Sequence, residues 1–238
     1  MSGSSTGRDR RRIYLMRHAE AAYITEAGHR APDSRLVPLT ARGRSQAEAM
    51  RVALEAVNFD RALCTGLPRT VETAGIVLGN RSLALGEVPA LEELKPGDIR
   101  LVPPDRLEAT FLNAMSNAEG AETRFLGGER FADFEARIVP AFEATIAEPG
   151  WQSLLLVAHG GVNRMILGWA CGAGRSIFPA FEQDPGCLNI IDVDFAGTVP
   201  ARALIRAVNL TPYNWTKAGM TATTMEVLLR DVLTAREA

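Results

Sequence analysis

The sequence has few cysteines and no long apolar run. Its three cysteines, Cys64, Cys171 and Cys187, are far apart and form no C-x-x-C pair, which argues against a disulfide framework or a zinc cluster. No stretch approaches the roughly 20 apolar residues that span a membrane. The apolar run that follows the basic N-terminus covers only residues 13–16 and is too short for a signal peptide. These features predict a cytoplasmic protein that does not contact a membrane.

The chain also has almost no lysine and no excess of charge of either sign. Only Lys95 and Lys217 are lysines among the 26 basic residues, and 28 acidic residues bring the net charge to −2. This balance excludes a global basic field for nucleic acid. Because arginine is the usual cation here, a single arginine is weak evidence for a phosphate site. The apolar content of 47% is that of a folded protein and excludes a disordered chain.

Short apolar runs alternate with helical patterns along most of the chain. The alternation is typical of a three-layer α/β sandwich, in which a mostly parallel central sheet carries helices on both faces. The predicted buried strands are 13–16, 62–64, 83–88 and 153–158, with a further pair at 188–195 and 201–208. The predicted helices are 40–57, 68–78, 104–117, 128–147, 162–171 and 223–236.

One domain with a short tail accounts for this pattern. Residues 1–11 are polar and basic and are expected to form a disordered N-terminal tail, whereas residues 12–238 form the domain. The segment from about 95 to 130 interrupts the strand–helix alternation, so we expect a helical lid inserted there. The strands near 188–208 lie at a predicted sheet edge, where two copies could pair as a homodimer.

Two of the three histidines follow predicted buried strands. His18 follows the first strand and His159 follows the strand at 153–158. Because ligands of parallel α/β sheets bind beyond the carboxyl ends of the strands, we expect the two imidazoles to converge there. Gly160 comes next to the second histidine, which suits a crowded pocket where the backbone comes close to a ligand. His29, in a polar loop, is interpreted as a structural residue.

Arginines and carboxylates at neighbouring strand ends complete a candidate phosphate site. Arg17 precedes the first histidine, and Arg69 lies near the start of the helix after a short strand. The planar guanidinium matches phosphate oxygens, so two arginines and two histidines around one point fit a phosphoryl group. Neutral imidazole is a competent nucleophile near pH 7, and a carboxylic acid can protonate a leaving alcohol. Glu92 and Glu93 are the candidates for that acid.

Six motifs, in order along the chain, resemble those of the histidine phosphatase superfamily, also called phosphoglycerate mutase-like. They are R-H-A at Arg17–Ala19, L-T-A-R-G-R-S-Q-A at Leu39–Ala47, T-G-L-P-R-T-V-E-T-A at Thr65–Ala74, L-x-E-x-x-x-G at Leu91–Gly97, G-G-E at Gly127–Glu129 and V-A-H-G-G at Val157–Gly161. An R-H pair alone is common, whereas six ordered motifs between residues 13 and 171 are specific.

The resemblance implies a role for each matching residue. His18 attacks phosphorus and becomes a phosphohistidine, and Glu93 protonates the departing alcohol before it activates the hydrolytic water. The phosphoryl oxygens are held by Arg17, Arg69, His159 and the N–H of Gly160. No metal or other cofactor is implied, because the arginines supply the positive charge. The implied activity is the hydrolysis of a small-molecule phosphomonoester.

Some positions leave alternatives open. Glu92 is the rival proton donor, and Arg130 after the G-G-E motif is either a surface charge or a second anion contact, the former being preferred. Ile24 stands where many members have an asparagine that touches phosphate, so Tyr23 or Thr25 could supply a neutral donor instead.

Two other functions compete with hydrolysis. A phosphoglycerate-type mutase uses the same chemistry, but the His-Tyr pair that mutases typically show after the acid is replaced here by Leu94-Lys95, which favours hydrolysis. A non-catalytic module that binds a phospho-ligand or a protein is the third possibility, and the presence of both a nucleophile and an acid argues against it.

Overall fold

A six-stranded sheet forms the centre of the protein. The computed structural model describes residues 9–25, 29 and 31–237. The strands lie in the order β3–β2–β4–β1–β5–β6. Their bounds are β1 (Asp9–Arg17), β2 (Arg61–Cys64), β3 (Leu85–Glu87), β4 (Ser153–Ala158), β5 (Leu188–Ala196) and β6 (Val199–Leu210). Strands β3, β2, β4 and β1 are parallel to one another, while β5 is antiparallel to both β1 and β6. The α/β fold is confirmed, with a sheet that is parallel where the two histidines emerge.

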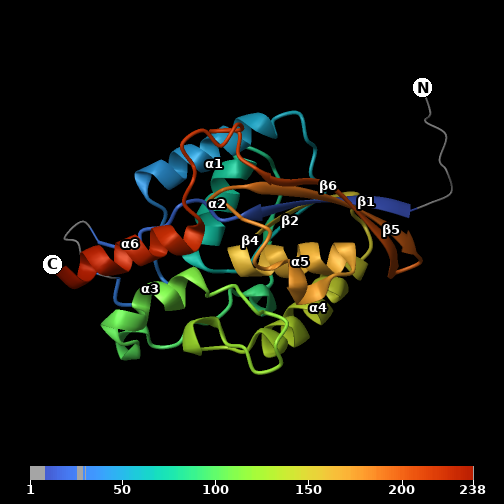
Figure 1. Ribbon diagram of the computed structural model, residues 1–238. Coiled ribbons are helices and arrows are strands. Elements are labelled where there is room, and N and C mark those ends of the chain that lie inside the picture. The colour runs from blue at the N-terminus through green and yellow to red at the C-terminus, as the bar shows by residue number, and fades with distance from the viewer. Residues whose placement is uncertain (1–8, 26–28, 30, 238) are drawn as a thin grey trace.

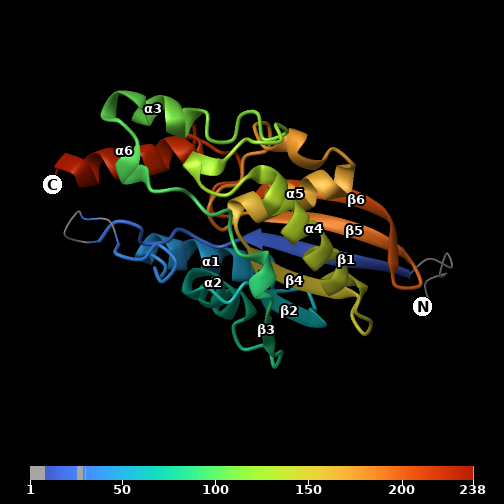
Figure 2. The ribbon, with the colours of Figure 1, turned by 90° about the horizontal axis from the view of Figure 1, so that it is seen from below.

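Helices cover both faces of this sheet, as Figures 1 and 2 show. One face carries α1 (Ala41–Ala53) and α2 (Pro68–Leu78), and the other carries α4 (Phe131–Ala147) and α5 (Gly160–Cys171). Two further helices, α3 (Pro104–Leu112) and α6 (Thr224–Glu237), lie side by side beyond the sheet in both views. Short 3-10 turns are η1 (Pro89–Leu91), η2 (Ile99–Leu101), η3 (Phe125–Gly127) and η4 (Gly174–Ile177).

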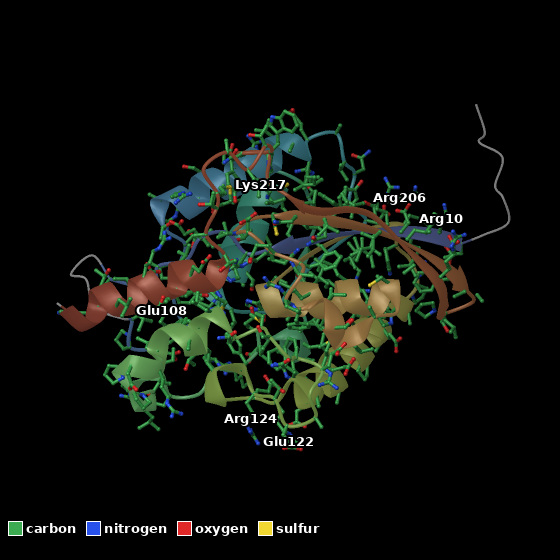
Figure 3. All side chains as sticks on the ribbon, viewed as in Figure 1. Arg10, Glu108, Glu122, Arg124, Arg206 and Lys217 are labelled. Carbon is green, nitrogen blue, oxygen red and sulfur yellow. The ribbon has the colours of Figure 1, made fainter. Side chains whose placement is uncertain are left out.

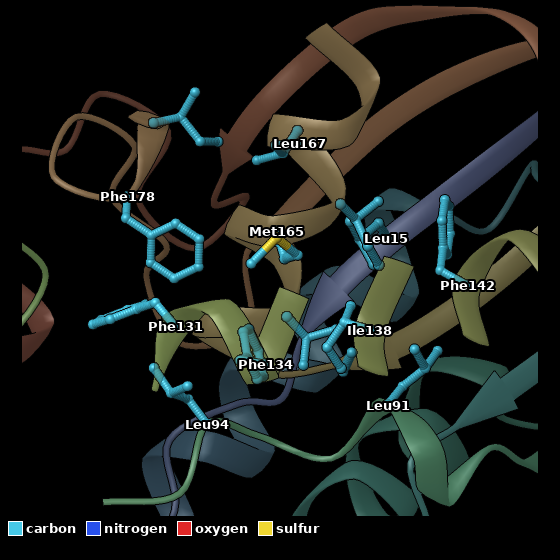
Figure 4. Close-up of a cluster of buried hydrophobic side chains, with 14 of the residues drawn as sticks. Leu15, Leu91, Leu94, Phe131, Phe134, Ile138, Phe142, Met165, Leu167 and Phe178 are labelled. Atoms are coloured by element: carbon cyan, nitrogen blue, oxygen red, sulfur yellow. The ribbon is translucent and has the colours of Figure 1, made fainter. Parts of the chain in front are cut away.

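The alternation of side chains along β4 explains the three layers. Leu154 and Leu156 belong to the hydrophobic cluster beneath α4 and α5, whereas Leu155 and Val157 belong to the cluster beneath α1 and α2. Successive side chains of a strand point to opposite faces, so a continuous apolar strand must be covered on both sides. Figure 4 shows the first cluster, in which phenylalanines of α4 meet Leu15 of β1.

Local sequence signals place two helix starts where they were predicted. The Thr40 side chain accepts a hydrogen bond from the N–H of Gly43 at 2.9 Å and caps α1. Pro68 is the first residue of α2, a position whose backbone N–H has no partner within the helix, so the proline costs no hydrogen bond. By contrast, α5 begins at Gly160, two residues before the predicted start, and α3 ends at Leu112 rather than at 117.

Strand β1 is longer than the sequence suggested. It begins at Asp9, so the expected tail is wrong for residues 9–11, and residues 1–8 lie outside the described residues. The basic run suggested a solvated segment, but its arginines find buried partners on β5: Arg12 donates to Asp192 at 2.6 Å and Arg10 donates to Asp194. Figure 3 shows Arg10 and Arg206 close together at this end of the sheet.

The segment predicted to form a lid contains η2, α3 and η3. Leu107 and Phe111 of α3 are buried in the same hydrophobic cluster as Met225 and Leu229 of α6. The segment is therefore packed onto the C-terminal helix. Within the described part of the chain, no helix is both long and apolar enough to span a membrane.

Candidate active site

The sheet register sets the two strand-end histidines next to each other. Strands β1 and β4 are parallel neighbours in which Arg17 pairs with Ala158, so His18 and His159 leave the sheet at the same level. Their ring centroids are 5.3 Å apart, with an angle of 68° between the ring planes. Both rings are buried. The structure thus brings together the two histidines that the sequence singled out.

Hydrogen bonds fix the orientation of the His18 ring. Its Nδ1 lies 2.7 Å from the carbonyl oxygen of Ala19, and Arg69 Nε lies 3.3 Å from its Nε2. A carbonyl can only accept and a guanidinium can only donate, so the proton belongs on Nδ1 and the lone pair on Nε2. Burial, followed by the charges of Arg69, His159 and Arg17, lowers the pKa of His18 well below its usual value. The ring is therefore a neutral imidazole at pH 7.

His159 lies beneath the same point and has one nitrogen without a partner. Its Nε2 is 2.8 Å from the Thr65 hydroxyl, whereas its buried Nδ1 has no hydrogen-bond partner among the described residues. Burial, followed by the charges of Arg69 and Arg17, lowers the pKa of His159 well below its usual value. This arrangement leaves Nδ1 available to a bound group.

Backbone carbonyls and one hydroxyl hold the two arginines. Arg17 Nη1 donates to the carbonyl of Gln183 at 2.6 Å and to the hydroxyl of Thr224 at 2.9 Å. Arg69 Nη1 donates to the carbonyl of Ser34 at 3.2 Å. Arg17 Nε is buried and has no partner within the described part of the chain. These hydrogen-bond partners of the two guanidiniums are neutral groups, so both charges are available to an anion.

Glu93 sits at the N-terminus of α5, on the same cavity as His18. The N–H of Gly161 lies 3.1 Å from each carboxylate oxygen, and the N–H of Leu94 donates to one of them at 2.9 Å. Partial positive charge at a helix N-terminus favours an anion in this place. The carboxylate is thus fixed close to the histidine pair.

A half-buried ion pair holds the loop that carries this acid. Arg137 donates to three carbonyl oxygens within residues 90–93, and its guanidinium pairs with Glu129 at 2.8 Å. The other oxygen of Glu129 accepts the N–H of Lys95 at 3.0 Å. A Cβ on Gly128 would lie 2.3 Å from the Lys95 carbonyl, so the loop and the G-G-E motif need this glycine to pack. The sequence pointed to the motif but gave no sign of Arg137, which is one arginine among many.

The rival residues have partners of their own. Glu92 pairs with Arg35 at 2.6 Å, although it also lines the cavity. Arg130 pairs with Asp133 at 2.8 Å and with Glu122 at 3.2 Å, in keeping with a surface charge.

The positions that differ from the expected phosphate donors are also accounted for. Ile24 lines the cavity beside Tyr23, whose ring centroid lies 5.8 Å from Cζ of Arg69. The Thr25 hydroxyl accepts the N–H of the exposed His29 at 3.2 Å and lies outside the cavity.

Two cavities meet at Arg17 and His18. The smaller, of about 200 Å³, is lined by Arg69 and Glu93 together with many apolar side chains. The larger, of about 500 Å³, is lined by charged side chains that include Arg42 and by apolar side chains that include Met220. No group of three histidine, cysteine or acidic side chains within the described ranges is placed to hold a metal ion.

Comparison of the sequence with known proteins finds phosphatases and a phosphoglycerate mutase among its relatives. The model of the histidine phosphatase superfamily (branch 1) matches residues 13–203. The adenosylcobalamin/alpha-ribazole phosphatase of Escherichia coli strain K12 is 33% identical over 77% of this chain and 90% of that protein. A 2,3-bisphosphoglycerate-dependent phosphoglycerate mutase of Methylobacterium radiotolerans is 31% identical over 82% of this chain and 95% of that protein.

Solved structures agree with the sequence comparison. The crystal structure of the alpha-ribazole phosphatase from Shigella flexneri superposes with a TM-score of 0.66 and 27% identity, and the match covers 83% of this chain and 96% of that one.

Proposed function

The chain belongs to the histidine phosphatase superfamily and is a phosphomonoester hydrolase that works through a phosphohistidine, and we propose that His18 is its nucleophile. The observation that carries this proposal is the orientation of the ring. The carbonyl of Ala19 takes the Nδ1 proton, so Nε2 presents its lone pair beside Arg69. Because its pKa is lowered, the ring needs no general base before it attacks phosphorus.

The cationic groups around His18 fit the transferred phosphoryl group. Arg17 and Arg69 offer charged N–H groups to its oxygens, and the N–H of Gly160 adds the start of α5. We assign the fourth contact to Nδ1 of His159, because a buried ring nitrogen without a partner gains a hydrogen bond when an oxygen arrives. The fixed charges oppose the charge that develops in the transition state, and no step of the proposed route calls for a metal.

We assign the proton transfers of both half-reactions to Glu93. In the first, its carboxyl proton passes to the ester oxygen as the bond from that oxygen to phosphorus breaks and the bond from Nε2 to phosphorus forms. In the second, the carboxylate takes a proton from the water that attacks the phosphohistidine, and phosphate leaves with the ring restored. Glu92 is the weaker candidate because Arg35 holds its carboxylate.

The substrate proposed is a small phosphorylated metabolite. Alpha-ribazole 5′-phosphate is the first compound to test, since the relative at 33% identity is named for alpha-ribazole. A phosphoglycerate mutase at 31% identity keeps a mutase activity as the second candidate. Against it stands the loop after the acid, where Leu94 and Lys95 replace the aromatic pair typical of mutases.

A phosphate-release assay without added metal tests the proposal. We expect turnover of p-nitrophenyl phosphate and of at least one metabolite, and the loss of both activities in His18→Ala. Substantial residual activity in His18→Ala would rule out His18 as the nucleophile. With 3-phosphoglycerate and a bisphosphoglycerate primer, isomerisation faster than phosphate release would replace the hydrolase with a mutase.

Two statements about the setting of the protein belong to the same proposal. We place it in the cytoplasm, where phosphorylated metabolites occur, and we propose that β6 pairs with its copy in a homodimer. Strand β6 ends the sheet, and Val199 and Leu210 on it are 64% and 44% exposed. Sedimentation of a monomer at micromolar concentration would contradict the dimer.

A further inference from the structure

Helix α6 adds a wall to the active-site cavity from outside the segment that the family model matches. That match ends at residue 203, whereas α6 begins at Thr224. Together with Thr224 and Asp231 of the same helix, Met225, Leu228 and Val232 line the smaller cavity. Their spacing of three and four residues sets them on one face of the helix, so this face is directed at the site. In Figure 1, α6 lies against α3 at the open end of the sheet.

The lid segment contributes further apolar residues to the same cavity. Phe111 lies on α3, and Phe125 lies on η3. Phe111 and Met225 are almost fully buried in one hydrophobic cluster, while Met115 and Leu228 are half-buried and pack against that cluster. An apolar surface of this kind binds an apolar group by removing both from water.

The position of the acid decides which cavity receives the leaving group. Glu93 and Arg69 line the smaller cavity and are absent from the lining of the larger one. A general acid must reach the ester oxygen within hydrogen-bond distance. The group attached to that oxygen therefore extends into the smaller cavity, between the lid and α6.

Polar contacts tie α6 to the phosphate end of the site. The hydroxyl of Thr224, the first residue of α6, accepts from Arg17 at 2.9 Å and donates to Glu182 at 2.8 Å. The same oxygen of Glu182 binds Arg164, a buried arginine that also lines the smaller cavity. These contacts place the apolar face of α6 at a fixed distance from the phosphoryl site.

We infer that α6 is the specificity element of this enzyme and that it selects phosphomonoesters whose leaving group carries an apolar, ring-sized substituent. The inference rests on the proposed function and names the substrate class of that site. Contacts of Leu228 and Met225 with the leaving group favour an apolar ester, because the apolar surfaces of the ester and of these side chains are then removed from water together.

Two alkyl esters with similar leaving oxygens test the inference. We would measure kcat/KM for 2-phenylethyl phosphate and for glycerol 3-phosphate with the full chain. The wild type is expected to prefer the phenylethyl ester by about tenfold or more, because small apolar groups give discrimination of roughly 10–200-fold in such pockets. Leu228→Asn is expected to lower kcat/KM for the phenylethyl ester far more than for glycerol 3-phosphate, so that most of this preference is lost.

Two further variants separate specificity from general damage. Leu233→Asn changes an exposed residue on the same helix that lines neither cavity, and should behave as the wild type. Thr224→Val removes the hydroxyl that Arg17 contacts, and should slow both esters alike because it acts at the phosphoryl end.

The measured kcat/KM values test the inference separately from the proposed function. Equal use of the two esters by the wild type would overturn the inference and leave the phosphatase intact. Equal slowing of both esters in Leu228→Asn, or the same effect in Leu233→Asn, would also overturn it. If neither these esters nor p-nitrophenyl phosphate were hydrolysed, the proposed function itself would fail.

Discussion

Gly161 offers a way to move the proposed acid without touching it. The N–H of Gly161 binds both carboxylate oxygens of Glu93, and a Cβ added at Gly161 would lie only 2.5 Å from one of them. To reach an ordinary contact of about 3.4 Å, that oxygen must retreat by about 0.9 Å. Alanine suits a helix better than glycine, so Gly161→Ala is expected to fold.

The displacement should appear in the leaving-group dependence. General acid catalysis contributes roughly 10²–10⁴-fold, and a shift of about 1 Å can cost roughly 10²-fold. We therefore expect Gly161→Ala to lower kcat for alkyl phosphates about 100-fold, or ~2.7 kcal/mol in activation free energy. Aryl phosphates should slow by less than about fivefold, because their leaving groups need little protonation.

Gly75→Ala, on helix α2 and outside the lining of both cavities, is the control for a glycine-to-alanine change in a helix. A Cβ at Gly75 would meet no atom within 4 Å. Steady-state kinetics with one alkyl and one aryl phosphate would compare the wild type with the two variants. Equal slowing of both substrates in Gly161→Ala, or an equal defect in Gly75→Ala, would refute the placement of the acid beside Gly161.

Three further predictions concern stability and the acid loop. Burial lowers the pKa of His18 and His159 below the 6.5 of the unfolded chain, so the unfolded state binds more protons below about pH 6.5. The free energy of unfolding should therefore fall on acidification by ~1.4 kcal/mol per pH unit for each histidine. Urea titrations between pH 7 and 5 should show a shallower loss for His18→Asn, and an unchanged slope would contradict this. Arg137→Met should slow alkyl phosphates about tenfold more than aryl phosphates, since it frees the acid loop; equal rate losses for the two classes would assign Arg137 a structural role alone. Gly168→Ala should destabilise the protein by about 1–3 kcal/mol, because the added Cβ would lie 2.0 Å from the carbonyl oxygen of Gly174. Gly75→Ala, with open space around it, should be neutral or stabilising. Thermal melts that rank the two variants in the reverse order would contradict this packing.

Residues at strand ends could be placed from the sequence because local patterns determine them. The apolar run before His18 and the run before His159 each predict a strand, and parallel strands present their carboxyl ends at one edge. What the sequence could not give was the partner of each side chain. Arg137 supports the acid loop from a helix more than 40 residues away, and nothing in its neighbourhood distinguishes it from other arginines.

The ends of the chain show the same limit. Residues 9–11 have the composition of a solvated tail, yet they extend β1, where Asp194 of β5 lies opposite Arg10 and accepts its hydrogen bonds. Helix α6 was predicted as a helix over residues 223–236, but its place over the active site depends on the packing of α3 and on the hydroxyl of Thr224. Such tertiary contacts leave no local signature in the sequence.

The covalent intermediate is the central claim, and quenching the enzyme during turnover tests it most directly. Acid-labile, alkali-stable phosphate should be recovered on a single peptide, and mass spectrometry should place it at His18. The His18→Ala protein should carry no covalent phosphate. The mechanism would be contradicted if the protein turned over substrate with the covalent phosphate on another residue. It would also be contradicted if Glu93→Gln, which should slow hydrolysis of the intermediate, turned over substrate without forming any phosphoenzyme.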